Sequence, residues 1–183
     1  MKVTGIIRRV DNSGYIDIPT EIRQSLHIRD GELLEIYATV DGELIYQKYS
    51  SIKKLSRIAT EYAHILASIS QMPVLICDRD HVVAASGVST QEYLKCRVTQ
   101  MLEEYMEDGC PYFSDCASDI KMQPVEGFNH PATIIYPIVL VNNVVGAVVF
   151  LESKLHISPS EVEFKTAQTA AAFLGKQIDE YAI

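Results

Sequence analysis

The spacing of apolar residues changes near residue 50, and this change divides the chain into parts of different character. Before it, apolar and polar side chains alternate, as over residues 34–40, which is typical of half-buried strands. After it, residues 51–70 place apolar side chains three and four apart, which is typical of a helix. We therefore expect a β-rich domain over residues 1–50, a helical connector over 51–70 and a second domain over 71–183.

The first fifty residues are predicted to form strands around one short helix. Gly5–Val10 and Tyr15–Ile18 are predicted strands on either side of a turn at Asp11–Gly14. Thr20–Leu26 is a predicted helix of two turns. The remaining strands form a predicted hairpin whose turn, Asp41–Gly42, favours type I′ geometry.

The apolar residues of this domain are few. A domain of this length buries only about 60% of the surface that its unfolded chain exposes, so a thin core leaves it marginally stable. We therefore expect this domain to need a second copy of the chain. The apolar residues expected in its core are Ile6, Ile16, Ile18, Ile22, Leu26, Leu34 and Ile36.

Two helical segments carry apolar residues at spacings of three and four. In the connector these residues run from Ile52 to Ile69, and in the final helix from Phe164 to Tyr181. The final helix is predicted to begin with Ser158 as its N-cap and Glu161 closing a capping box. Each seam could pack on its own domain or join two chains, and the spacing alone leaves both possibilities open.

The second domain is predicted to be α+β with an antiparallel sheet. Val74–Cys77 pairs with His81–Ala85, and Thr133–Val141 pairs with Val144–Leu151 across a turn at Asn142–Asn143. Helical structure is expected from Gln91 to about Asp108. Helices gathered on one face of the sheet would complete the fold.

Charge and hydropathy restrict the compartment and the partners. The formal net charge of −8 excludes a protein coated in basic charge, although residues 1–50 carry six Lys or Arg against eight Asp or Glu. The longest apolar stretch, residues 132–151, is interrupted by Pro137 and Asn142, so no membrane span is expected. Arg8 and Arg9 stand where a signal peptide needs its apolar segment, so a cytoplasmic protein is expected.

No catalytic constellation stands out in the sequence, and we expect no enzyme, no cofactor and no metal. The five histidines are scattered, and no glycine-rich phosphate loop is present. Cys110 and Cys116, with His130 nearby in sequence, leave open a metal site, a redox sensor or an enzyme, although their spacing fits no ligand pattern.

Three segments of the first domain form a recognisable pattern, and they are Thr4–Asp11, Gly14–Leu26 and Leu34–Tyr37. Together they resemble the DNA-binding domain of AbrB-type transcriptional regulators. With the second domain behind it, the layout resembles sporulation and stationary-phase regulators that end in a GAF domain. The resemblance implies a dimeric swapped-hairpin β-barrel, a C-terminal GAF domain and a tetramer joined through helices.

The resemblance also implies a DNA face formed by Arg8, Arg9, Tyr15, Arg23 and Gln24. Tyr15 and Gln24 stand where the family has basic residues. Six arginines per dimer remain for phosphate contacts, and the expected partner is A·T-rich promoter DNA. The alternative, which the same two departures support, is a paralogue whose first domain only dimerises or binds a protein.

GAF domains often bind small molecules between the sheet and the segments that cover it. Here that region would include Ser86–Gly87, residues 109–131 and the strand from Thr133. The resemblance therefore implies a domain that senses an unidentified small molecule, and a purely structural domain is the alternative.

Overall fold

The computed structural model describes residues 5–114, 121–153 and 158–181. The chain divides into two compact units, Met1–Tyr49 and Ser50–Ile183, which are described separately. Residues 51–70 belong to the second of these units.

The first unit holds one helix and one hairpin within its described residues. Helix α1 spans Thr20–Ser25, and strand β1, Leu34–Ala38, pairs antiparallel with β2, Leu44–Lys48. The predicted type I′ turn is wrong, because only Gly42, at φ 84°, has a positive φ in this loop. Thr39 N–H donates to the Glu43 carbonyl at 2.9 Å, so three residues form the loop and Gly42 takes its left-handed position.

The predicted strands before α1 do not form in the single chain. Residues 5–10 and 15–19 belong to no strand or helix. One backbone bond, from Asp11 N–H to the Tyr15 carbonyl at 3.0 Å, closes the turn between them. A two-stranded ribbon without a third strand or a covered face is marginal in water, which explains this difference from the prediction.

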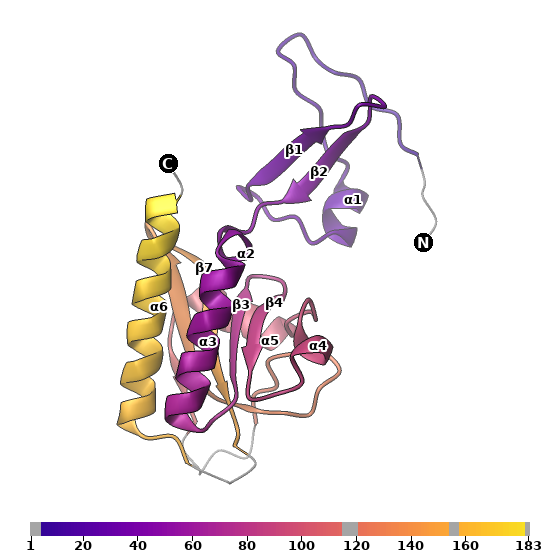
Figure 1. Cartoon of the computed structure of the whole chain (residues 1–183). Helices are drawn as coiled ribbons and strands as arrows, with labels where there is room; N and C mark the ends of the chain where they lie inside the picture. Colours follow the sequence, from indigo (N-terminus) through magenta and orange to yellow (C-terminus); the bar gives the residue numbers. More distant parts are fainter. Residues whose placement is uncertain (1–4, 115–120, 154–157, 182–183) are drawn as a thin grey trace. The chain divides into compact units, whose positions relative to one another are not determined.

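The second unit contains a five-stranded antiparallel sheet in the order β4-β3-β7-β6-β5 (Figure 1). Strand β3 pairs with β4 and β6 pairs with β7, which confirms the two predicted hairpins, and the central strand β7 also pairs with β3. Its elements are α2 (Ser51–Lys54), α3 (Ser56–Ser70), β3 (Val74–Asp78), β4 (Val82–Ser86), α4 (Thr90–Tyr93), α5 (Gln100–Asp108), β5 (Tyr112–Phe113), β6 (Ala132–Leu140), β7 (Asn143–Leu151) and α6 (Glu161–Tyr181).

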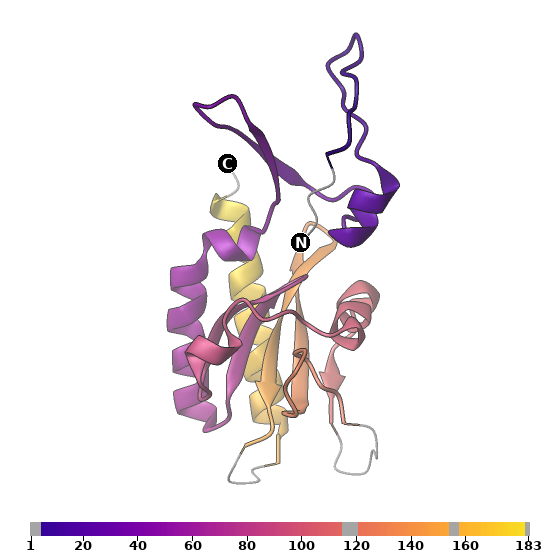
Figure 2. The same cartoon turned by 90° about the vertical axis from the view of Figure 1, so that its right-hand side faces the viewer.

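Helices cover both faces of this sheet, because its central strands are apolar on both sides. Alternate residues Val74 and Ile76 of β3 face one core, while Leu75 and Cys77 face the other. Helices α3 and α6 pack on the first face, and α5 covers the second (Figure 2), where Tyr93 of the short α4 joins the same buried cluster. The prediction of helices on one face alone is therefore wrong.

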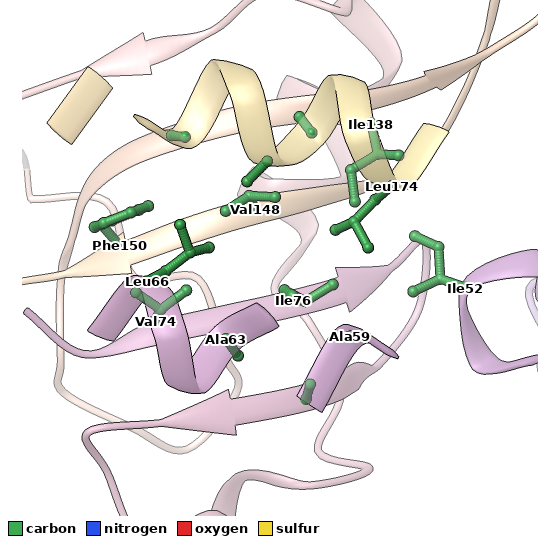
Figure 3. Packing of buried hydrophobic residues seen from close by; sticks show 14 of the residues in the cluster. Ile52, Ala59, Ala63, Leu66, Val74, Ile76, Ile138, Val148, Phe150 and Leu174 are labelled. Atoms are coloured by element: carbon green, nitrogen blue, oxygen red, sulfur yellow. The ribbon is translucent and has the colours of Figure 1, made fainter. Parts of the chain in front are cut away.

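The apolar seams of α3 and α6 face their own sheet. Ala59, Ala63 and Leu66 of α3 are buried in the same cluster as Ala167, Ala171, Leu174 and Ile178 of α6. Figure 3 shows Leu66 and Leu174 directed toward Val74, Val148 and Ile138 of the strands. The seams therefore serve the core of the second unit, which was one of the two readings left open.

The predicted helix over residues 91–108 is interrupted and forms α4 and α5. Lys95 has φ 66°, and Val98 pairs with Val125 in an isolated bridge. Helix α5 then starts anew at Thr99, whose hydroxyl accepts from Leu102 N–H at 3.3 Å. A buried β-branched residue followed by Thr99 is the signal that the prediction missed.

The final helix starts two residues later than predicted. Ser160 N–H donates to the Glu163 carboxylate at 2.9 Å, and the Ser160 hydroxyl also donates to that carboxylate. The capping box therefore joins Ser160 and Glu163 in place of Ser158 and Glu161. The Ser160 hydroxyl bond lowers the pKa of Glu163 below its ordinary value.

The turn between β6 and β7 also differs by one residue from the predicted position. Leu140 pairs with Asn143, and the two loop residues Val141 and Asn142 have φ of 44° and 68°. These values belong to a type I′ turn. The left-handed region is costly for a β-branched residue such as Val141, so this turn is strained.

Candidate nucleic-acid interface

The predicted residues Arg8, Arg9 and Tyr15 lie on either side of the turn that begins at Asp11. The Asp11 carboxylate accepts from Ser13 N–H at 2.9 Å and from Tyr15 N–H at 2.8 Å. Gly14, at φ 85°, supplies the left-handed residue that this turn requires. The turn brings the segment that follows it back toward the arginines, and Arg8 Nε lies 4.0 Å from Asp17 Oδ2.

Arg23 and Gln24 lie on α1, which begins immediately after Pro19. Arg23 Nη1 donates to Asp30 Oδ1 at 3.1 Å, and Nη2 donates to the Thr20 hydroxyl at 3.5 Å. Within the described ranges, the enclosed Nε of Arg23 has no hydrogen-bond partner. The guanidinium is therefore held against its own unit, while the Gln24 side chain is exposed.

The five predicted residues form two groups in the structure. Arg8, Arg9 and Tyr15 belong to the turn segment, and Arg23 and Gln24 belong to α1. In the part of the chain that the structure describes, no hydrogen bond or ion pair joins the two groups. Tyr15 is 75% exposed, so its hydroxyl is accessible to a phosphate.

Carboxylates of the same unit neutralise two of the three arginines. Arg8 faces Asp17, and Arg23 faces Asp30. Arg9 forms no ion pair with any residue that the structure describes. The Arg23–Asp30 pair was not predicted, because a spacing of seven residues across a loop leaves no periodic signal in the sequence.

Lys48 has a structural role in the same unit. Its ammonium lies 3.3 Å from Glu32 Oε1 and donates to the His27 carbonyl at 2.7 Å. Both side chains of this ion pair are largely buried, at 22% and 15% exposure. Lys48 therefore fastens β2 to the loop between α1 and β1.

The first unit has almost no buried residue of its own. Among residues 5–49, only Pro19 is buried. The exposed apolar side chains of this unit are Ile6, Ile7, Val10, Tyr15, Ile16, Leu26, Leu33, Ile36, Tyr37, Val40, Leu44, Ile45 and Tyr46. A domain with this much exposed apolar surface is typical of one that is completed by a partner.

A half-buried polar cluster of the second unit is centred on His130. His130 Nε2 lies 2.8 Å from the Glu152 carbonyl oxygen, so this nitrogen carries a proton and donates. In the neutral ring, Nδ1 then accepts from the Tyr93 hydroxyl at 3.2 Å. Burial raises the pKa of Tyr93, and its ring packs 4.0 Å from the ring of Phe128. This cluster joins α4 to the loop before β6 and to the end of β7.

The cysteines of the second unit lie in different surroundings. Cys77 is fully buried, and burial raises the pKa of its thiol above the ordinary range. The Cys96 thiol donates to the Glu92 carbonyl at 2.8 Å, and Cys110 is exposed. Cys116, the second residue of the hypothesised metal or redox pair, lies outside the described residues. Over the ranges that are described, no group of three His, Cys, Asp or Glu is placed to hold a metal ion.

No described helix is long and apolar enough to cross a membrane.

Comparison with known proteins assigns both parts of the chain. Residues 54–179 match the family described as the C-terminal domain of stage V sporulation protein T, a transcription factor. Residues 7–54 match the family described as antidote-toxin recognition MazE, a bacterial antitoxin.

Two relatives from Bacillus subtilis strain 168 resemble the chain. Stage V sporulation protein T is 40% identical over 182 residues, which are 98% of this chain and 100% of the relative. The transition state regulatory protein AbrB is 47% identical over 49 residues, which are 27% of this chain and 50% of that protein. These relatives confirm the predicted resemblance to AbrB-type regulators and to sporulation regulators with a second domain behind the AbrB-like one.

A solved structure supports the fold of the second unit. The GAF domain of an Acinetobacter phosphoenolpyruvate-protein phosphotransferase superposes with a TM-score of 0.53 at 13% identity, over 73% of this chain and 93% of that chain. The predicted GAF fold, with its antiparallel sheet and packed helices, is therefore confirmed. With a full-length relative and two matching domains, the chain belongs to the family of stage V sporulation protein T, with an AbrB-like first unit and a GAF-like second unit.

Proposed function

We propose that this protein is a DNA-binding transcription regulator of sporulation or stationary-phase genes. The observation that carries the proposal is the full-length likeness to stage V sporulation protein T, together with exposed arginines on the AbrB-like unit. Arg8, Arg9 and Arg23 would contact phosphates, and Tyr15 could donate a hydrogen bond to a phosphate oxygen. The expected target is A·T-rich promoter DNA.

The DNA-binding unit acts as a dimer in this proposal. The support for a dimer is physical. Among residues 5–49 only Pro19 is buried, so this unit lacks a hydrophobic core. A swapped-hairpin barrel would supply partner strands to residues 5–10 and 15–19 and cover the exposed apolar side chains. It would also double the number of arginines that meet the DNA.

The GAF-like unit would hold dimers together as a tetramer or sense a small molecule. Helices α3 and α6 leave apolar side chains at the surface: Ile69 is 70% exposed, and Phe173, 37% exposed, stacks on Tyr62 at 4.8 Å. On the opposite face, the space between the sheet and α5 is filled by buried side chains such as Leu102, Met106 and Met122. The observed packing favours the oligomerisation role of this unit.

Restoring the missing basic residues tests the DNA face. The double variant Tyr15→Arg, Gln24→Arg should bind A·T-rich duplexes more tightly in a salt titration. It should steepen the logarithmic salt dependence by about four per dimer if all four new cations reach phosphates. Arg9→Ala should weaken binding and flatten the slope. An unchanged affinity and slope in the double variant would show that another face meets the DNA.

A second function is favoured by the two internal ion pairs and by the net negative charge of residues 1–50. In this alternative the first unit only dimerises or binds a protein. The same titration separates the two functions. A paralogue that only dimerises or binds a protein would show no salt-dependent DNA affinity, so Arg9→Ala would leave its binding unchanged.

A further inference from the structure

The arginines of the proposed DNA face differ in the interactions within the protein that must break before their side chains can contact a phosphate. Arg9 has no ion-pair partner within the described ranges, whereas Arg23 makes two hydrogen bonds to its own unit. One of these is a charge-assisted bond to Asp30, at 3.1 Å, which is short enough to be well formed. The Arg8–Asp17 pair is longer, at 4.0 Å, and is therefore weaker.

A phosphate oxygen and a carboxylate oxygen compete for the same guanidinium. Both are anionic acceptors, and arginine recognises them with the same planar donor geometry. Arg23 cannot donate Nη1 to Asp30 and to a phosphate along the same direction. A phosphate that approaches Arg23 along the direction of Asp30 therefore replaces the bond to Asp30, and only the difference between the two interactions adds to the DNA affinity.

Asp30 is well placed for this exchange. Its side chain is 97% exposed, so little else holds it and water can solvate the carboxylate after it is released. Asp30 precedes Gly31, which has φ 77°, in the loop that links α1 to β1. The Arg23 side chain is less exposed, at 41%, and stays near α1 while its partner changes.

We propose that Asp30 is an internal competitor that occupies Arg23 in the free protein and sets the affinity of this unit for DNA. This inference rests on the proposed function and adds a residue that the DNA-face resemblance does not contain. Removal of Asp30 frees Arg23 and tightens DNA binding about two- to fivefold at low salt, which is the range of an exposed ion pair. The gain decreases at higher salt because the pair is screened.

The test is a double-mutant cycle read by fluorescence anisotropy on a 40-base-pair A·T-rich duplex, using the full-length protein. Its members are the wild type, Asp30→Asn, Arg23→Ala and the double variant. Asp41→Asn is the matched control, because it removes one exposed carboxylate from the hairpin loop and changes the net charge equally. Asp30→Ser provides a second removal if Asp30→Asn fails to fold by circular dichroism.

Asp30→Asn should bind two- to fivefold more tightly than the wild type, and more tightly than Asp41→Asn. In the Arg23→Ala background the additional gain should vanish. A gain equal to that of Asp41→Asn, or a gain that persists without Arg23, would overturn the role of Asp30 as a competitor.

Arg9→Ala separates this failure from failure of the proposed function. If Arg9→Ala weakens DNA binding and Asp30→Asn does not tighten it, the proposed DNA face is supported and the competitor role of Asp30 is refuted. If neither Arg9→Ala nor Arg23→Ala changes the affinity, the DNA face itself falls and the competitor role falls with it.

Discussion

The Ser50 hydroxyl donates to Oδ2 of Asp78 across 2.7 Å and also accepts from Lys53 N–H at 3.1 Å. Ser50 is therefore the N-cap of α2 and a partner of a carboxylate that is only 8% exposed. The other oxygen of Asp78 accepts from the backbone N–H groups of Asp80 and His81. The first residue of the second unit is thus fastened to the turn between β3 and β4.

Ser50→Ala should lower the stability of the protein by about 1–2 kcal/mol, because it removes a helix cap and one partner of a buried carboxylate. The measurement is chemical denaturation followed by circular dichroism. Ser56→Ala is the control, since Ser56 is exposed and its hydroxyl forms no hydrogen bond with the described residues. Equal stability of the two variants would contradict the role assigned to the Ser50–Asp78 bond.

A truncated chain of residues 50–183 should melt cooperatively, whereas one of residues 72–183 should not. The shorter chain lacks α2 and α3, which bury Ile52, Leu55, Ala59, Ala63 and Leu66 in the core over the sheet. Losing even one large aliphatic core residue costs about 2–5 kcal/mol, and the whole stability of a domain is about 5–15 kcal/mol. Differential scanning calorimetry of the two chains measures the difference. A sharp transition in the shorter chain would refute the prediction that it cannot fold alone.

Val141→Asn should stabilise the protein by about 1 kcal/mol. Val141 has φ 44°, and asparagine tolerates the left-handed region better than a β-branched residue does. The side chain of Val141 is 77% exposed, so its replacement removes little packing. Thermal melting should show a higher midpoint for this variant.

Val139→Asn is the control for the turn, because Val139 is also an exposed valine of the same hairpin but has no positive φ. It should be neutral or slightly destabilising, as asparagine is disfavoured in strands. A stabilisation as large as that of Val141→Asn would mean that removal of exposed apolar surface, and not relief of backbone strain, is the cause.

The α6 capping box should make stability depend on pH in the acidic range. The pKa of Glu163 is lowered in the folded protein by its bond from the Ser160 hydroxyl. A lowered pKa means that the stabilisation is present above the unfolded pKa of about 4.3 and is lost as pH falls through the folded value. Ser160→Ala should cost about 1 kcal/mol at pH 7 and progressively less in acid. Denaturation at pH 7 and pH 3 measures this difference, and an equal cost at both would contradict it.

The strands and long helices of the second unit could be predicted because each carries its own period. β3, β6, β7 and α6 lie within one or two residues of their expected bounds. The errors fall where a contact that the sequence pattern does not encode, tertiary or local, decides the structure. Val98 pairs with Val125 and interrupts an otherwise helical stretch, and Ser160 competes successfully with Ser158 for the cap.

The arginines of the candidate site could be predicted from the sequence, but the carboxylates that pair with them could not. Arg8, Arg9 and Arg23 follow from the segments that resemble AbrB-type regulators, since a motif retains residue types at fixed positions. The pairing of Arg23 with Asp30 depends on how the loop after α1 returns toward the helix, which no sequence period encodes. The strands expected on either side of Asp11–Gly14 failed for another reason: the pattern describes a strand, but a single chain provides no neighbour for it to pair with.

Because almost no residue of the first unit is buried, the stability of this unit depends on the concentration of the protein. A unit that gains its core only by association has a stability that depends on protomer concentration, by mass action. Under the dimer proposal, dilution would disassemble the DNA-reading unit and expose it to proteases, while Ser50–Ile183 would keep its own core. A modest change in synthesis or degradation could then change promoter occupancy more than proportionally.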